Sequence, residues 1–249
     1  MVSRVVIFFY SLVCYAVALA ALLYAIGFIG DLVVPKTIDS GMAVDPKTAL
    51  AYDLPLLALF AIQHSVMARQ GFKRWWTKIV PKSAERATYV LLAGAILFLL
   101  YWQWKPIAGA VWTITDPMWA GMLTVVYFVG WGILFLSTFL INHFELMGLQ
   151  QSFAGLRGND VEPPSFKMPL LYKLVRHPIY FGLLIVFWAT AHMSVGHLVF
   201  ALATTGYVFI GILLEERDLI AFFGDTYRKY KAAVPMVIPL AKFGRAKKA

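Results

Sequence analysis

The feature that most constrains this chain is a run of 25 residues without a charged side chain, residues 5–29. About 20 apolar residues are enough to cross the hydrocarbon core of a bilayer as an α-helix. The run is too long for the apolar region of a secretory signal peptide and lacks a convincing small-residue cleavage site, so we interpret it as a retained span. The residue types AVILMFWYC make up 61% of the chain, against roughly 45–50% apolar residues in soluble domains. The apolar interior of a lipid bilayer can accommodate this many apolar side chains.

Five further apolar segments continue the pattern, although the last two are short and almost touch in sequence. They cover residues 50–67, 87–104, 119–142, 178–193 and 196–214. We therefore predict an all-α fold, a polytopic transmembrane helical bundle of about six membrane-embedded helices. The chain is expected to form a single integral membrane domain, residues 1–249, with four transmembrane segments in residues 1–142.

The lysine and arginine residues predict how the bundle is oriented. If the N-terminus is cytoplasmic and the six segments alternate, 19 of the 22 basic residues fall on the cytoplasmic side, and only Lys36, Lys47 and Lys105 lie opposite. This asymmetry follows the positive-inside rule, so both termini are expected in the cytoplasm. Contact with anionic membrane lipid then accounts for the net charge of +9, and a nucleic-acid partner is unnecessary.

The most unusual local sequence leads into the fifth segment and contains Tyr172, Arg176, His177, Pro178 and Tyr180. Pro178 suits the first turn of a helix, where its missing N–H costs nothing, and this places His177 near the N-cap. The free N–H groups of such a turn favour an anion, and Arg176 strengthens that preference. The alternative interpretation is a basic and aromatic anchor at the membrane interface.

Two adjacent carboxylates, Glu215 and Glu216, follow the apolar part of the sixth segment. Carboxylates next to an apolar helix need partners or water; the alternative is a solvated helix end with Arg217 as the counter-charge. Because two residues separate the last two segments, we predict a C-terminal helical hairpin whose open ends share the cytoplasmic face. A helix start that attracts anions would then lie beside two carboxylates and aromatic walls. A ligand with a carboxylate, an ammonium and an aromatic base, such as S-adenosylmethionine, suits that arrangement.

An amphipathic helix is predicted after the carboxylates. Leu219, Phe223, Tyr227 and Tyr230 fall on one helical stripe, as their spacing of three and four residues requires. The remaining residues are largely basic, which is typical of a helix that lies in the membrane interface. A lid over the site and a membrane anchor both fit this pattern.

Taken together, these motifs resemble the signature of the isoprenylcysteine carboxyl methyltransferase superfamily, which includes phospholipid N-methyltransferase and NnrU-like membrane proteins. Two upstream stretches, around His64 and around His143, further resemble the bacterial methanethiol S-methyltransferase branch. The residues that carry the superfamily resemblance are Arg176, His177, Pro178, Tyr180, Gly182, Glu215, Glu216, Leu219, Phe222, Phe223, Gly224, Tyr227, Tyr230, Val234 and Pro235.

The resemblance implies a multi-pass enzyme of the bacterial inner membrane that uses S-adenosylmethionine, with residues 143–249 as the cofactor-binding methyltransferase region. Arg176 joins the expected cofactor site through the anion argument given above. The other residues that would bind the cofactor are Tyr172, His177, Pro178, Ile179 and Tyr180, together with Glu216 or its neighbour Glu215.

One departure from the superfamily pattern bears on the acceptor. The prenylcysteine enzymes carry an arginine one turn before the glutamate, and it is thought to hold the carboxylate of the acceptor. Here that turn contains Gly211, Ile212, Leu213 and Leu214, with no cation. A prenylcysteine acceptor is therefore not expected, and a small neutral or thiol acceptor fits better. The resemblance of the two upstream stretches implies methanethiol in the first place, giving dimethyl sulfide, and hydrogen sulfide in the second; another lipid-soluble acceptor is the alternative.

A thiol acceptor must lose its proton, and a general base would help it to do so. His143, which lies beside Asn142 and Glu145, and His64 are the catalytic candidates, because both lie at the predicted cytoplasmic ends of their segments. Either histidine could instead be a hydrogen-bonded structural residue, or the two could be axial ligands of a haem in a non-enzymatic membrane protein. The single cysteine, Cys14, excludes a multi-cysteine metal cluster, and we expect no metal.

The topology can be tested with reporter fusions. Fusions at five positions should report outside, inside, outside, inside and inside, because the basic residues are retained in the cytoplasm. These positions are, in order, Lys47, Ser83, Asp116, Asp160 and the C-terminus. A C-terminus that reports from the outside would contradict the predicted hairpin.

Overall fold

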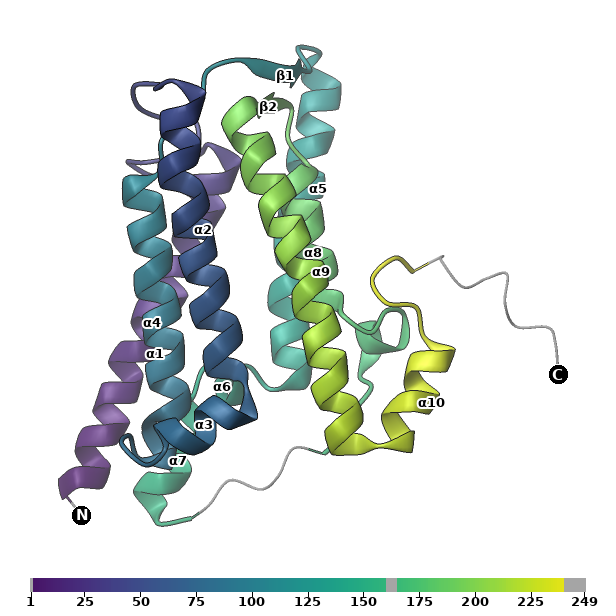
Figure 1. The fold of residues 1–249 in the computed structure, drawn as a ribbon. Coiled ribbons are helices and arrows are strands. Elements are labelled where there is room, and N and C mark those ends of the chain that lie inside the picture. Colours follow the sequence, from purple (N-terminus) through teal and green to yellow (C-terminus); the bar gives the residue numbers. More distant parts are fainter. Residues whose placement is uncertain (1, 160–164, 240–249) are drawn as a thin grey trace, which may run out of the picture. The chain divides into compact units, whose positions relative to one another are not determined.

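We describe residues 2–159 and 165–239 in a computed structural model of the chain (Figure 1). The basic residues from Lys242 onward, which the orientation argument used, lie outside the described residues. Five of the described helices are long and apolar enough to cross a membrane: α1 (Val2–Gly30), α2 (Pro46–Ala68), α4 (Lys82–Gln103), α5 (Pro117–Ile141) and α9 (Val195–Phe223). A sixth apolar helix, α8 (Pro178–Trp188), has only 11 residues. The all-α polytopic fold is confirmed.

The chain folds into two compact units, which we describe one at a time. The described part of the first unit contains residues 2–113, 142–159 and 192–203. The second unit contains residues 114–141, 165–191 and 204–239. The long helix α9 begins in the first unit and continues through the second.

In the first unit, α4 packs against both α1 and α2 (Figure 1). The approach of α1 to α4 is close at Gly94, where an added Cβ would lie 3.1 Å from Cα of Ala18. Cys14 and Ala18 belong to a buried core that also includes Tyr89 and Met147. Cys14 is therefore the small buried side chain that its apolar surroundings predict.

Short elements complete the first unit. The helices α3 (Gln70–Trp76), α6 (His143–Leu146) and α7 (Leu149–Arg157) follow the ends of longer helices, and α7 packs against α1 and α4. A two-stranded antiparallel sheet joins β1 (Ala110–Thr113) to β2 (His192–Ser194).

In the second unit, α8 runs antiparallel to α5. Two glycines allow the contact: an added Cβ on Gly182 would lie 2.6 Å from the carbonyl oxygen of Gly130, and glycine is the residue that permits so close an approach of helices. At one end the hydroxyl of Tyr172 donates to the carbonyl of Ser137 (3.4 Å), and at the other the N–H of Ile114 donates to the carbonyl of Ala191 (2.8 Å). The segment that contains α8 therefore follows α5 for roughly 30 Å, about the thickness of the hydrocarbon core.

The prediction for the fifth segment was wrong in one respect, because its helix ends at Trp188 and not near residue 193. The last two segments are therefore not joined by a two-residue turn. Residues 189–194 form an extended link that contains β2 and bonds to β1. Non-helical backbone needs such partners in a membrane protein, because lipid offers no hydrogen bonds.

The end of the sixth segment also differs from the prediction. Helix α9 continues to Phe223, so Glu215 and Glu216 lie inside a helix and not at its end. The amphipathic helix is α10 (Asp225–Ala233), which begins after Gly224 and leaves α9 in a new direction (Figure 1). Gly224 has φ +57° and ψ −130°, a backbone conformation that glycine adopts readily and that stops α9. Leu219 and Phe223 consequently belong to a different helix from Tyr227 and Tyr230.

The glycine contact between α5 and α8 yields a stability prediction. Gly182→Ala places a Cβ against main-chain atoms of α5, which cannot move aside as a side chain could. We expect a loss of about 1–3 kcal/mol, the usual effect of overpacking, visible as a lower unfolding temperature in detergent.

Gly132→Ala on α5 is the matched control, because an added Cβ there meets nothing within 4 Å. This control should unfold at or above the wild-type temperature, since alanine favours a helix. Equal unfolding temperatures for the two variants would refute the close packing.

Candidate functional site

A buried carboxylate, Glu216, is the centre of the candidate site. Its side chain is only 2% exposed, inside the apolar helix α9. One of its oxygens, Oε1, lies 2.7 Å from Arg176 Nε and 3.2 Å from His177 Nε2, while the other, Oε2, lies 2.5 Å from Lys231 Nζ. These partners offset the large cost of removing a carboxylate from water.

Arg176 also holds the chain that follows α10, residues 234–237, which we call the C-terminal strap. Arg176 Nη1 donates to the carbonyl of Lys231 (3.0 Å) and to that of Val234 (2.5 Å). The main-chain N–H groups of Arg176 and His177 donate to the carbonyls of Pro235 (2.9 Å) and Met236 (3.1 Å). Arg176 therefore connects the start of α8, the C-terminal third of α9 and the end of α10.

The start of α8 is confirmed as predicted, with His177 at the N-cap and Pro178 in the first turn. The His177 ring lies between the two carboxylates, because its Nδ1 is 3.7 Å from Glu215 Oε2 while its Nε2 faces Glu216. Glu215 is 45% exposed, whereas the side chains of His177 and Glu216 are buried. Tyr180, one turn further along α8, places its ring 5.7 Å from that of His177.

Tyrosine side chains connect the remaining elements of the site. Tyr172, in the short helix η1 (Leu170–Lys173), accepts a hydrogen bond through its carbonyl from the hydroxyl of Tyr230 (2.6 Å). Burial raises the pKa of Tyr230 to about 12 and also raises the pKa of Tyr172. Both phenols therefore stay protonated at neutral pH and can donate hydrogen bonds. The ring of Phe166 lies 5.3 Å from that of Tyr230, so the aromatic side of α10 packs against protein.

The helical turn before the carboxylates is apolar in the structure as well as in the sequence. Ile212 is fully buried, while Leu213 is exposed. Gly211 faces the hydroxyl of Tyr180, which would lie 3.6 Å from an added Cβ. The turn in which prenylcysteine enzymes carry an arginine therefore holds apolar side chains and no cation here.

His143, the first catalytic candidate, lies in the first unit. It is 3% exposed, and its Nε2 is 3.2 Å from the hydroxyl of Tyr15. Burial lowers the pKa of His143, which keeps its ring neutral at pH 7, the form that accepts a proton. The neighbours named from the sequence do lie together: Asn142 caps α6, and its Nδ2 is 3.1 Å from Glu145 Oε2.

His64, the second candidate, also belongs to the first unit, on α2. Its Nε2 lies 2.8 Å from the hydroxyl of Tyr89, and its ring stacks on Phe60 with 5.2 Å between centroids. Its Nδ1 is buried and has no hydrogen-bond partner in the described part of the chain. A tyrosine hydroxyl thus faces Nε2 of both histidines, which does not favour the haem-ligand alternative.

The residues predicted to bind the cofactor all lie in the second unit. The contacts described above bring five of them together, namely Arg176, His177, Tyr180, Glu215 and Glu216. Sequence reasoning missed the roles of Lys231 and of the C-terminal strap. The superfamily motif includes Tyr230, Val234 and Pro235, so their spacing could have indicated that this part of the chain belongs to the site. Lys231 carried no such signal, because it is one of several basic residues on α10.

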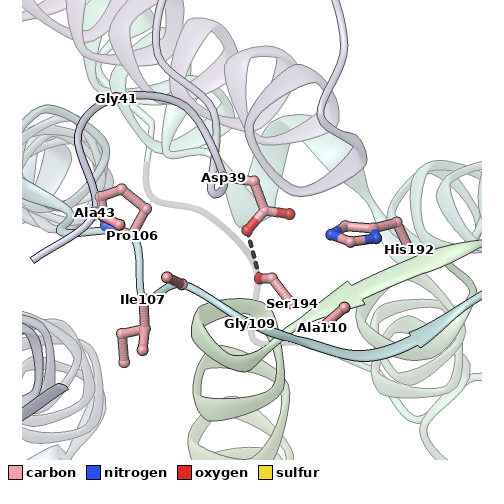
Figure 2. Close-up of a pocket in the computed structure, with 10 residues that line it drawn as sticks. Asp39, Gly41, Ala43, Pro106, Ile107, Gly109, Ala110, His192 and Ser194 are labelled. Atoms are coloured by element: carbon pink, nitrogen blue, oxygen red, sulfur yellow. Dashed lines mark hydrogen bonds between the residues drawn. The ribbon is translucent and has the colours of Figure 1, made fainter. Parts of the chain in front are cut away.

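A separate pocket of about 300 Å³ lies in the first unit, among loops and strand ends (Figure 2). Figure 2 shows Ser194 and Asp39 facing each other, and the Ser194 hydroxyl donates to Asp39 Oδ1. His192 lines the same pocket, and its Nδ1 lies 3.0 Å from Thr113 Oγ1. None of the residues predicted for catalysis or cofactor binding lines this pocket.

Comparisons with known proteins agree with the motifs. The model of the NnrU protein family matches residues 54–232. Methanethiol S-methyltransferase 1 of Bradyrhizobium diazoefficiens is 54% identical over 96% of this chain and 84% of its own. The methanethiol S-methyltransferase of Mycobacterium tuberculosis is 48% identical over 95% of this chain and 97% of its own. Mouse Nurim is 32% identical over 73% of this chain and 72% of its own.

No solved structure matches the chain. The family model covers well over half of the residues, and the methyltransferase relatives align along nearly the whole length. The chain therefore belongs to the NnrU family and, within it, to the methanethiol S-methyltransferase family.

Proposed function

We propose that this protein transfers a methyl group from S-adenosylmethionine to methanethiol, giving dimethyl sulfide. The observation that carries the proposal is the 45–54% identity, over at least 92% of the chain, to proteins named methanethiol S-methyltransferase. The bacterial methyltransferase relatives support a place in the bacterial inner membrane. The positive-inside asymmetry of the sequence supports cytoplasmic termini. Hydrogen sulfide is a second small thiol that the same site would accept.

The charges around Glu216 fit the amino-acid part of S-adenosylmethionine, which carries one ammonium and one carboxylate. Glu215 and Glu216 supply negative charge for the ammonium, while Arg176 and Lys231 supply positive charge nearby. His177 lies between the two carboxylates and can position either of them. Bound S-adenosylmethionine supplies an electrophilic methyl group on a positively charged sulfur. Tyr172, Pro178, Ile179 and Tyr180 would complete the walls of the site.

The apolar turn before Glu215 supports a small neutral acceptor. A carboxylate-bearing acceptor would meet Glu215 and Glu216, while Ile212 and Leu213 offer no cation to pair with it. Burying such a charge without a partner is costly. Methanethiol is small and apolar enough to dissolve in lipid, so it can approach from the bilayer without a polar channel.

The remaining task of the protein is to hold the reactants together, exclude water and remove the thiol proton. Charge disappears as a thiolate approaches a sulfonium, so a site poor in water favours the reaction, and positioning contributes most of the rest. We propose that His143 or His64 accepts the thiol proton. The neutral ring of His143 and the unpartnered Nδ1 of His64 support this role.

Removing the charge of Glu216 tests the donor site. Glu216→Gln keeps the shape of the side chain but removes the anion that would pair with the donor ammonium. Loss of a charged hydrogen bond costs roughly 1.5–3 kcal/mol, so S-adenosylmethionine should bind at least about 10-fold more weakly in calorimetry.

The matched control is Asp225→Asn, which removes a carboxylate that is 81% exposed on the neighbouring helix and should leave binding unchanged. Unfolding temperatures of both variants separate a binding defect from a folding defect. If Glu216→Gln unfolds early, Glu215→Gln probes the same charge at a half-exposed position. Wild-type affinity in folded Glu215→Gln and Glu216→Gln proteins would show that the donor site is misassigned.

The reaction itself is tested by supplying methanethiol and S-adenosylmethionine to membranes that contain the protein. Dimethyl sulfide should appear in the headspace, and its rate of formation should rise with pH toward the thiol pKa, because the thiolate is the nucleophile. Membranes with Glu216→Gln serve as the control. Methyl ester on a farnesylcysteine acceptor, with no dimethyl sulfide, would reject the thiol acceptor.

A further inference from the structure

Within the described part of the chain, three groups contact the Glu216 carboxylate, and they differ sharply in exposure. The side chains of Arg176 and His177 are 4% exposed, whereas that of Lys231 is 42% exposed. A ligand that arrives from outside can therefore reach Lys231 first. An exposed ion pair is also weak compared with a buried one, because water screens it. Of the three contacts to Glu216, the one from Lys231 is the easiest to exchange.

The main chain at Lys231 is fixed although its side chain reaches solvent. Arg176 Nη1 donates to the carbonyl of Lys231 at 3.0 Å, and Arg176 is itself held by Glu216. The side chain of Lys231 can therefore change partners while its Cα stays beside the site. A long, flexible lysine side chain suits such a change.

Arg176 cannot exchange partners in this way without losing hydrogen bonds to main-chain carbonyls. Its Nε faces Glu216, and its Nη1 donates to two carbonyls, those of Lys231 and Val234. Turning this guanidinium toward a ligand would break the bonds that hold the C-terminal strap and leave buried acceptors unpaired, which is costly.

We propose that Lys231 recognises the carboxylate of the methyl donor by exchanging partners with it. The donor ammonium takes the place of the lysine ammonium at Glu216 Oε2, and the released Lys231 pairs with the donor carboxylate. This inference rests on the proposed function, because it assumes that an α-amino acid group binds at this site.

After the exchange, each charged group involved still has a partner of opposite charge. Before binding, Glu216 Oε2 faces Lys231. After binding, the same oxygen faces an ammonium, and Lys231 faces a carboxylate, so one ion pair becomes two. Without the exchange, the donor carboxylate would lie near Glu215, which is half-exposed, and would lack a cation of its own. Lys231 would thereby make the site selective for donors that keep their carboxylate.

Two ligands separate the roles of the two charges. S-adenosylhomocysteine has both the ammonium and the carboxylate, whereas S-adenosyl-3-thiopropylamine keeps the ammonium and lacks the carboxylate. Their affinities are measured by calorimetry for the purified full-length wild type, Lys231→Gln, Lys231→Arg and the control Lys229→Gln. Lys229 is an exposed cation on the same helix, so its variant controls for the change in net charge.

We expect Lys231→Gln to bind S-adenosylhomocysteine about 10-fold or more weakly, the usual effect of losing a charged hydrogen bond. Lys231→Gln should bind S-adenosyl-3-thiopropylamine as tightly as the wild type does, or more tightly. The reason is that no lysine ammonium then competes with the ligand ammonium for Glu216. Retained binding of the amine also shows that the variant is folded. Lys231→Arg should restore most of the preference for the carboxylate, and Lys229→Gln should match the wild type with both ligands.

Other outcomes would overturn the inference. Tighter binding of both ligands by Lys231→Gln would mean that Lys231 only shields Glu216. Equal weakening for both ligands would mean that Lys231 merely supports the fold of the site. If the wild type binds neither ligand, the proposed donor site fails and the inference fails with it; if the wild type binds both and Lys231→Gln is unchanged, only the inference fails.

Discussion

A carboxylate buried in an apolar helix is the interaction on which the second unit depends. Glu216 lies inside α9, where neither lipid nor water can stabilise its charge, so its partners must come from the protein. They come from the start of α8 and the end of α10, segments that lie 39 residues before and 15 residues after it in sequence. The need to pair one charge thus draws three elements together.

Arg176 makes this arrangement cooperative. It neutralises Glu216 and at the same time donates to carbonyls at the end of α10 and in the C-terminal strap. A change at any one of these residues leaves the others with unpaired buried groups, whose cost exceeds the value of a single hydrogen bond. The charges proposed to bind the donor therefore also hold the second unit together, and substitutions there must be tested for folding as well as binding.

The helix α8 achieves its position with unusually few residues. Gly130 and Gly182 let the backbones of α5 and α8 approach closely, where dispersion contacts take the place of a hydrophobic driving force. Because α8 is short, its N-terminal turn and the residues before it lie alongside α5, where the hydroxyl of Tyr172 reaches the carbonyl of Ser137. The close contact between α5 and α8 therefore fixes the positions of Arg176 and His177, which directly precede α8.

The sequence by itself determined the properties that depend on local composition and spacing. Runs of apolar residues predicted the long helices, Pro178 predicted the start of α8, and the paired motifs predicted which residues gather in the second unit. These features are predictable because hydropathy, helix capping and motif spacing depend on residues that lie within a few helical turns of one another in sequence. The end of α8 at Trp188 was not predictable in this way, because the link that follows it is held by partners distant in sequence. The N–H of Ile114 donates to the carbonyl of Ala191, and β2 pairs with β1.

Only the tertiary structure decided which charges meet. The sequence spacing of Arg176, Glu216 and Lys231 does not predict that one carboxylate faces both cations. It also does not predict that Arg176 donates hydrogen bonds to the C-terminal strap. The sequence showed α10 as a basic amphipathic helix suited to a membrane surface, yet its aromatic side packs on Phe166 and one of its lysines enters the site. Ion pairs between distant segments depend on where the chain turns. Here it turns at Gly224, whose φ is positive, and such a turn redirects every residue that follows it.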